Sequence, residues 1–434
     1  MSEVERGRTM SASPASLAVL PRRAAVIMLL AFASAYFLSA LLRAVTATLA
    51  PVFSRELALG AAQLGLLAGA YFVGFAAMQL PLGIALDRHG PRRVLVALLA
   101  VAVAGSVAFA AAQTLTQLLV ARLFIGVGVA GCLMAPLTAY RHHFTPELQL
   151  RANAWMLMTG SFGMLASTLP VQWLLPHTGW RGLFLALAVA VLGAMAVVAL
   201  AVPRDRPSRS EASATPNDKT ARAGYAQVFG HPSFVALAPL GFFAYGGLVA
   251  MQTLWIGPWL TQVAGFSPTA AAAGLFGINA GMLVAFLVWG AAIPRLLRAG
   301  WSGERVIAAA WWPGCLVLAV IVWLGEGATA AWWALWCVCT SVVSLSQPAL
   351  GQVFPAALAG RALSAYNLVL FAGVFVVQWG LGLLIDLLLG SGWGTAAAYR
   401  AAFGVFLGAC VVSFAWFIYC RHQRRGSPQP DPTR

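Results

Sequence analysis

Long apolar runs separated by short polar segments make up almost the whole chain. A helix needs about 20 apolar residues to cross a bilayer, and cutting the sequence at charged, Pro and Gly clusters leaves twelve runs of about that length. The runs cover roughly residues 28–52, 62–82, 94–112, 117–140, 152–175, 182–202, 233–256, 270–292, 304–324, 329–350, 363–388 and 398–420. The pattern predicts an all-α membrane protein with twelve transmembrane helices.

One connection is much longer than the others. Residues 203–231, which begin with PRDRPSRSEASATPNDKTARAG, are rich in Pro, Ser and Arg and too poor in apolar residues to fold on their own. This linker divides the chain into two halves of six spans each. We therefore expect five parts: a tail (1–24), a six-helix bundle (25–202), the linker (203–231), a second six-helix bundle (232–420) and a tail (421–434).

The composition excludes a soluble protein. Of the 434 residues, 61% are hydrophobic and 9% are charged, whereas about 25% are charged in an ordinary soluble domain. The cysteines lie in or beside apolar runs, and Cys337 and Cys339 lack the spacing and polar partners of a zinc site. We interpret all six as small hydrophobic residues (Cys132, Cys315, Cys337, Cys339, Cys410 and Cys420). The sequence thus predicts neither a metal site nor a cofactor.

The first apolar run has some features of a signal peptide. Arg22 and Arg23 precede it, and residues 33–35 read ASA, as at a cleavage site. The apolar stretch continues to Pro51, however, and this length favours an uncleaved first span.

The basic residues predict the orientation, because Lys and Arg accumulate in cytoplasmic segments. With the N-terminus inside, inner segments hold 22 of the 27 basic residues, outer segments hold Arg55, Arg181 and Arg400, and two arginines lie within spans. We therefore expect both termini in the cytoplasm of a bacterial cell and the spans in its inner membrane. The net charge of +15 is spread over seven inner segments, so it indicates topology rather than nucleic-acid binding.

Two motifs resemble those of a known transporter family. GIALDRHGPRRVL (83–95), between the second and third spans, resembles the loop signature of the major facilitator superfamily, although Pro91 stands where a basic residue is more usual. LLVARLFIGVGVAG (118–131) is similar to the fourth-span pattern of that family, with Arg122, Gly126 and Gly128 in place. The resemblance implies a bacterial-type secondary transporter, in which two pseudo-symmetric six-helix bundles move a small solute by alternating access.

The resemblance also implies a role for the first motif. In this family the loop is thought to latch the two halves on the cytoplasmic side, and the matching residues are Gly83, Asp87, Arg88, Gly90 and Arg92. The two glycines permit tight turns and close helix approach, and the aspartate accepts hydrogen bonds at a helix N-terminus or pairs with an arginine. A simple basic loop is the alternative. The stretch AAIPRLLRAGWSGERV after the eighth span looks like a second copy that has lost its Asp.

Two arginines lie inside predicted spans, where a charge is costly and usually functional. Arg43 is twelve residues before Arg55, or about 18 Å along a helix, in an apolar core about 30 Å thick. Arg122 lies in the outer third of the fourth span. No carboxylate shares the middle of the membrane with them, since all acidic residues lie in loops, tails or span ends, Asp386 among them. An arginine fork matches a carboxylate, so we expect an anionic substrate; bracing of helices is the alternative for Arg122.

Further candidates for substrate contact follow from the resemblance. In the family, spans 1, 4, 7 and 10 line the cavity, and spans 5, 8 and 11 contribute to it. The polar or aromatic residues of this chain in such spans are Tyr36, Tyr245, Gln252, Trp255, Asn279, Tyr366, Asn367 and Gln378. Each could instead serve contacts between helices.

The function predicted is transport of a small organic anion, either coupled to protons or passive, by a monomer surrounded by lipid. A proton-coupled drug or metabolite exporter that uses Asp87 or Asp386 is the first alternative. The second is a sensor that keeps the transporter fold without transport. The spans contain no buried Ser–His pair, paired Asp or His-rich cluster, so the sequence does not predict an enzyme.

Overall fold

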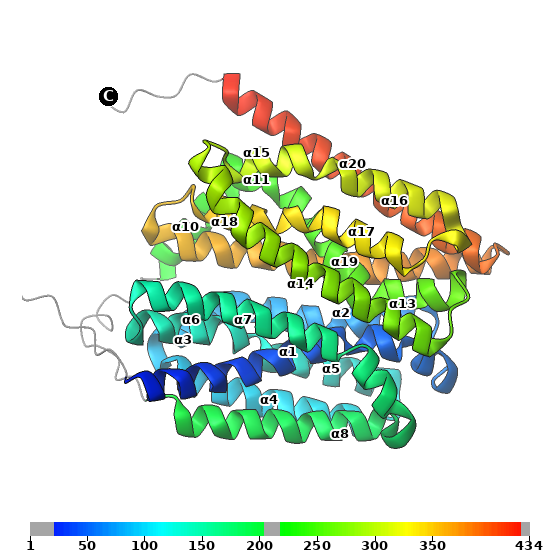
Figure 1. The fold of residues 1–434 in the computed structure, drawn as a ribbon, viewed down its shortest axis with the longest axis horizontal. Helices are drawn as coiled ribbons and strands as arrows, with labels where there is room; N and C mark the ends of the chain where they lie inside the picture. The colour runs from blue at the N-terminus through cyan, green and yellow to red at the C-terminus, as the bar shows by residue number, and fades with distance from the viewer. Residues whose placement is uncertain (1–20, 204–217, 427–434) are drawn as a thin grey trace, which may run out of the picture.

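The computed structural model describes residues 21–203 and 218–426, which are helical almost throughout and contain no β-strand. The first half comprises α1 (Arg22–Glu56), α2 (Ala61–Ala77), α3 (Gln79–His89), α4 (Pro91–Ala111), α5 (Leu115–Val129), α6 (Gly131–His143), α7 (Pro146–Ala166) and α8 (Leu169–Ala201). These helices form the lower bundle in Figure 1. Residues 1–20, 204–217 and 427–434, which belong to the predicted tails and linker, lie outside the described residues. The predicted tails overlap the helices, because α1 begins at Arg22 and α20 continues to Gly426.

The second half forms the upper bundle in Figure 1. It comprises α10 (Asp218–Gly230), α11 (Pro232–Leu240), α12 (Gly246–Ala250), α13 (Ile256–Pro258), α14 (Pro268–Arg298), α15 (Gly303–Ala310), α16 (Trp312–Leu324), α17 (Ala330–Thr340), α18 (Ser346–Gly351), α19 (Ala356–Gly390) and α20 (Thr395–Gly426). Three π-helical turns, η1 (Gly241–Tyr245), η2 (Met251–Trp255) and η3 (Trp259–Val263), interrupt the seventh span. Short 3₁₀ turns, η4 (Gly325–Gly327) and η5 (Ser341–Leu345), occur in the ninth and tenth spans.

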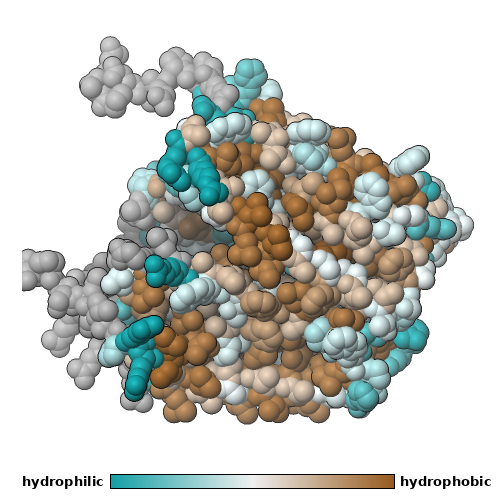
Figure 2. Space-filling model, in the orientation of Figure 1, coloured by the Kyte–Doolittle hydropathy of each residue, from teal (hydrophilic) through white to brown (hydrophobic). Residues whose placement is uncertain are grey.

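The helices make the twelve predicted crossings. Ten stretches of the described chain are long and apolar enough to cross a membrane, and α2 with α3, bent by 44°, makes an eleventh. The remaining crossing is α7 followed by the first turns of α8, up to a break at Gly179, where φ is 60°. Figure 2 shows a broad hydrophobic surface across the middle of the molecule with hydrophilic residues towards its two ends, as a bilayer requires.

The last part of the linker is helical, although the sequence predicted an irregular segment. Residues 218–230 form α10, and Val228 of this helix is fully buried. Gly224 packs so closely on α19 that a Cβ would overlap the guanidinium of Arg361. Contacts with the second bundle therefore stabilise a helix whose own sequence is too polar to fold alone.

The two halves meet mainly along α2 and α19. We call the end of the molecule where α1 begins and α8 ends the linker end, and the opposite end the far end (Figure 1). Towards the far end, a Cβ at Gly65 would overlap the carbonyl of Gln378, and a Cβ at Gly257 would lie 2.5 Å from the carbonyl oxygen of Ala47. These glycines bring the helix backbones of the two halves into direct contact.

Candidate functional site

Arg43 lies on α1 at the boundary between the two halves. Its guanidinium interacts with the side chains of Tyr36 on α1, Tyr71 on α2 and Tyr245 in η1, and its Nε is buried without a hydrogen-bond partner. Tyr245 belongs to the second half, and the other two tyrosines belong to the first. The site thus combines a permanent cation with phenol groups, which donate hydrogen bonds to an anion. Such a site is suited to a carboxylate or sulfonate that would take up the free N–H.

Arg122 lies on α5 against α1 and is almost fully buried, with 1% of its surface exposed. Its Nη1 donates a 2.9 Å hydrogen bond to the carbonyl of Leu42, the residue before Arg43. Its Cζ is 5.7 Å from the ring centre of Tyr71 and 5.8 Å from that of Phe109. Tyr71 therefore packs on Arg122 and interacts electrostatically with Arg43. Nη1 of Arg122 is bonded to a protein group, whereas its Nε and Nη2 are buried without a hydrogen-bond partner.

Tyr71 was not singled out from the sequence. It is fully buried, and its hydroxyl donates a 3.4 Å hydrogen bond to the carbonyl of Ser39 on α1. A tyrosine among small apolar residues of the second span is the only signal that the sequence offers. Its importance depends on which face of α2 meets α1, and an apolar run does not reveal that.

The other predicted residues lie in η2, α14 and α19. Trp255 is fully buried and packs edge-to-face on Tyr399 of α20, while Gln252, also in η2, is 8% exposed. Asn279 donates to the carbonyl of Leu275 in its own helix at 2.9 Å.

Three predicted residues on α19 are bonded to protein groups. The hydroxyl of Tyr366 donates to the carbonyl of Leu237 at 3.1 Å, and Gln378 Nε2 donates to Thr253 Oγ1 at 2.9 Å. Asn367 Oδ1 accepts from Gln347 Nε2 at 2.6 Å, and Asn367 Nδ2 donates to Gln79 Oε1 of α3 at 3.3 Å. Asn367 therefore joins the two halves, and sequence reasoning missed both of its partners.

The predicted latch motif lies at the linker end of α3 and the start of α4. Gly90 has a φ of 76° and separates the two helices, as the expected tight turn requires. Asp87 and Arg88 are exposed in the last turns of α3, and Arg92 is partly exposed in the first turn of α4. Gly83 lies within α3, where a Cβ would meet no atom within 4 Å. The close helix approach expected at Gly83 is therefore absent from this conformation.

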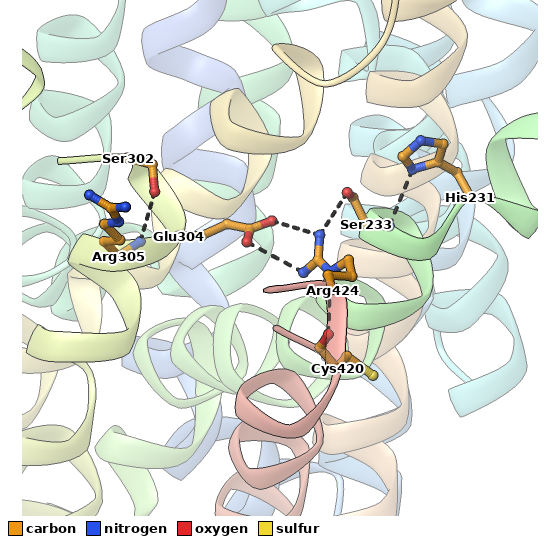
Figure 3. A network of polar contacts seen from close by, with 7 residues as sticks. All are labelled: His231, Ser233, Ser302, Glu304, Arg305, Cys420 and Arg424. Atoms are coloured by element: carbon orange, nitrogen blue, oxygen red, sulfur yellow. Dashed lines mark hydrogen bonds and ion pairs between the residues drawn. The ribbon is translucent and has the colours of Figure 1, made fainter. Parts of the chain in front are cut away.

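The stretch that resembles a second copy of this loop lacks the Asp but contains another carboxylate, Glu304. Its two oxygens lie 3.2 and 3.3 Å from Nη1 and Nη2 of Arg424, so α15 is tied to the end of α20 (Figure 3). Arg424 Nη1 also donates to Ser233 Oγ at 2.8 Å, and Nδ1 of His231 accepts from the backbone N–H of Ser233 at 3.2 Å. This network connects three helices within the second half.

The network predicts a pH dependence of stability. Burial, and then the positive charge of Arg424, lower the pKa of His231 in the folded protein. Protonation would also remove the acceptor that Nδ1 offers to Ser233. The folded state is thus disfavoured as the pH falls through the unfolded pKa of about 6.5. We expect the melting temperature to drop more between pH 7.5 and pH 5.5 in the wild type than in His231→Asn; equal drops would contradict the prediction.

Comparison with known proteins decides the family. The sequence model of the Major Facilitator Superfamily matches residues 32–378. The chain belongs to the Major Facilitator Superfamily. It is therefore a multi-pass membrane transporter, as the two motifs predicted.

Solved structures of this superfamily share the fold. A bacterial homologue of the human lysosomal transporter Spinster, in an inward-facing and unoccupied conformation, superposes with a TM-score of 0.74 and 16% identity over 95% of this chain and 100% of that chain. A D-xylose–proton symporter gives a TM-score of 0.70 and 13% identity over 90% and 96% of the two chains. The likeness confirms two bundles of six helices.

One curated relative is similar in part of its sequence. The probable sulfoacetate transporter SauU of Cupriavidus necator is 30% identical over 161 residues, which are 36% of this chain and 37% of that protein. The match thus spans little more than a third of the relative.

Proposed function

We propose that this transporter moves a small organic anion across the membrane and that Arg43 holds the anion. The observation that carries the proposal is the unpartnered Nε of Arg43, buried among three tyrosines at the boundary of the halves. An arginine inside a membrane protein is costly unless an opposite charge or hydrogen bonds compensate it. An anionic substrate would supply that charge.

The partial similarity to a probable sulfoacetate transporter supports an anion with a carboxylate and a sulfonate. Both groups match an arginine fork. We assign Tyr36 and Tyr245 to contact with the anion, because they reach Arg43 from the two halves. We assign Arg122 to holding α1 in place through Leu42. In this proposal Gln252, Trp255, Asn279, Tyr366, Asn367 and Gln378 serve contacts between helices.

The proposed orientation places the linker end in the cytoplasm of a bacterial cell. Basic residues at this end of the described helices include Arg22, Arg23, Arg93, Arg295 and Arg298. Their excess over the far end follows the rule for cytoplasmic segments. In this orientation the GIALDRHGPRRVL motif lies on the cytoplasmic side, where we propose that it latches the halves.

Counterflow in proteoliposomes tests the proposal. The purified full chain is reconstituted and given a panel of small carboxylates, sulfonates and cationic drugs, with and without a pH gradient. We expect exchange of carboxylates or sulfonates only, and stimulation by the gradient would indicate coupling to protons. Exchange of cationic drugs alone would support the exporter alternative instead, and absence of any exchange would favour the sensor.

A further inference from the structure

A carboxylate of the second half binds the first turn of a helix in the first half. Asp386, near the far end of α19, accepts hydrogen bonds through Oδ1 from the backbone N–H of Ala61 at 3.0 Å and through Oδ2 from that of Ala62 at 2.8 Å. The first N–H groups of a helix have no partner within the helix, and negative charge is favoured beside them. Both oxygens of Asp386 are thus used across the boundary between the halves.

Glycines permit this contact. A Cβ at Gly60 would lie 2.9 Å from Oδ2 of Asp386, although the φ of −72° at Gly60 is open to any residue. Glycine at position 60 is therefore needed for the approach of the carboxylate, because the backbone conformation there would accept any residue. Next to this contact, a Cβ at Gly382 would overlap the carbonyl of Ala61. The start of α2 and the end of α19 consequently touch backbone to backbone.

The contacts between α3 and α19 towards the linker end are of a different kind. There a hydrogen bond between neutral amides joins the halves, with Asn367 Nδ2 donating to Gln79 Oε1 at 3.3 Å. A longer bond between neutral groups is weaker than two bonds to an ionised carboxylate. Of these two contacts between the halves, the stronger one is therefore the carboxylate contact at the far end.

We propose that Asp386 is a positioning residue for transport, whose ionised carboxylate holds the far end shut by capping α2. Alternating access requires this contact to break each time the far end opens and to form again when it closes. The inference rests on the transporter family alone and is independent of the charge of the substrate. Removing the negative charge is expected to shift the equilibrium towards the far-end-open state by about tenfold, the scale of the interaction between a partly buried charge and a helix N-terminus.

Hydrogen–deuterium exchange of the full chain in nanodiscs tests the proposal. Asp386→Asn keeps the shape of the side chain and removes its charge, whereas Gly60→Ala keeps the carboxylate and obstructs its approach. Glu326→Gln is the control, because Glu326 is an exposed carboxylate at the far end of the same half. Peptides from the start of α2, from the end of α1 and from η3 report on the far end, and peptides from α3 and α6 report on the linker end.

In both test variants we expect about tenfold faster exchange at the far end together with slower exchange at the linker end. The control should match the wild type. Faster exchange at residues 61–63 alone would show a local cap and overturn the proposal, as would faster exchange at both ends, which indicates general loosening. Because the two variants disturb the same contact from opposite sides, failure of one to fold leaves the other as the test.

Discussion

Arg43→Ala is expected to abolish anion transport, with at least about a hundredfold loss of exchange. Two charge-assisted hydrogen bonds to an anion are each worth about 1.5–3 kcal/mol, and about 2.7 kcal/mol corresponds to a hundredfold change in affinity. The remaining tyrosines around Arg43 supply hydrogen bonds without the opposite charge. Initial rates of counterflow with the anion that the wild type exchanges fastest measure the effect.

Two further variants make this experiment specific. Arg43→Lys keeps the charge and loses the planar fork, so we expect transport between that of the wild type and that of Arg43→Ala. Arg55→Gln removes a charge from the same helix, at an exposed residue whose Nε is bonded to the carbonyl of Pro51, and should transport normally. Equal loss in Arg55→Gln and Arg43→Ala would show that net charge, rather than the site, is responsible.

Gly126→Ala is expected to destabilise the fold by about 3 kcal/mol, the upper part of the usual range for overpacking. A Cβ at Gly126 of α5 would overlap the carbonyl of Tyr71, and a Cβ at Gly74 of α2 would overlap the carbonyl of Leu123. Backbone atoms cannot move aside as a flexible side chain can, so α2 and α5 would have to separate. Because Tyr71 packs on Arg122 and interacts electrostatically with Arg43, the same change should also reduce transport by the protein that folds.

The matched control for this substitution is Gly404→Ala. Gly404 lies within α20, where a Cβ would meet no atom within 4 Å, and alanine is the better helix former. Thermal unfolding followed by size-exclusion chromatography should show a lower melting temperature for Gly126→Ala and an unchanged or higher one for Gly404→Ala. Similar melting temperatures for Gly126→Ala and the wild type would contradict the close packing of α2 on α5.

The crossings were predictable from the sequence because lipid requires apolar side chains over the full width of the bilayer. Arg43 is a candidate from the sequence for the same reason, since a charge stands out in an apolar run. The faces of the helices were not predictable. Leu200 is 87% exposed and Leu42 is fully buried, yet both lie in strongly apolar runs. When lipid and protein interior are both apolar, a span has no polar face to indicate which side faces the lipid and which faces the other helices.

This limit explains why some residues of the site could not be predicted from the sequence. Tyr71 and Gln79 acquire their partners only when α2 and α3 are placed against other spans, one beside α1 and the other beside α19. The cap that Asp386 provides joins residues more than 300 positions apart, so no local sequence pattern predicts it. The helix at 218–230 was missed because its stability depends on α19 rather than on its own composition.

Equilibrium binding of a labelled carboxylate or sulfonate to the purified protein tests the central claim most directly. The wild type and Arg55→Gln should bind the anion saturably with similar affinity, and Arg43→Gln should bind it at least about a hundredfold more weakly while keeping the wild-type melting temperature. Binding of the anion by Arg43→Gln with the affinity of the wild type would contradict the assignment of Arg43 as the group that holds the substrate.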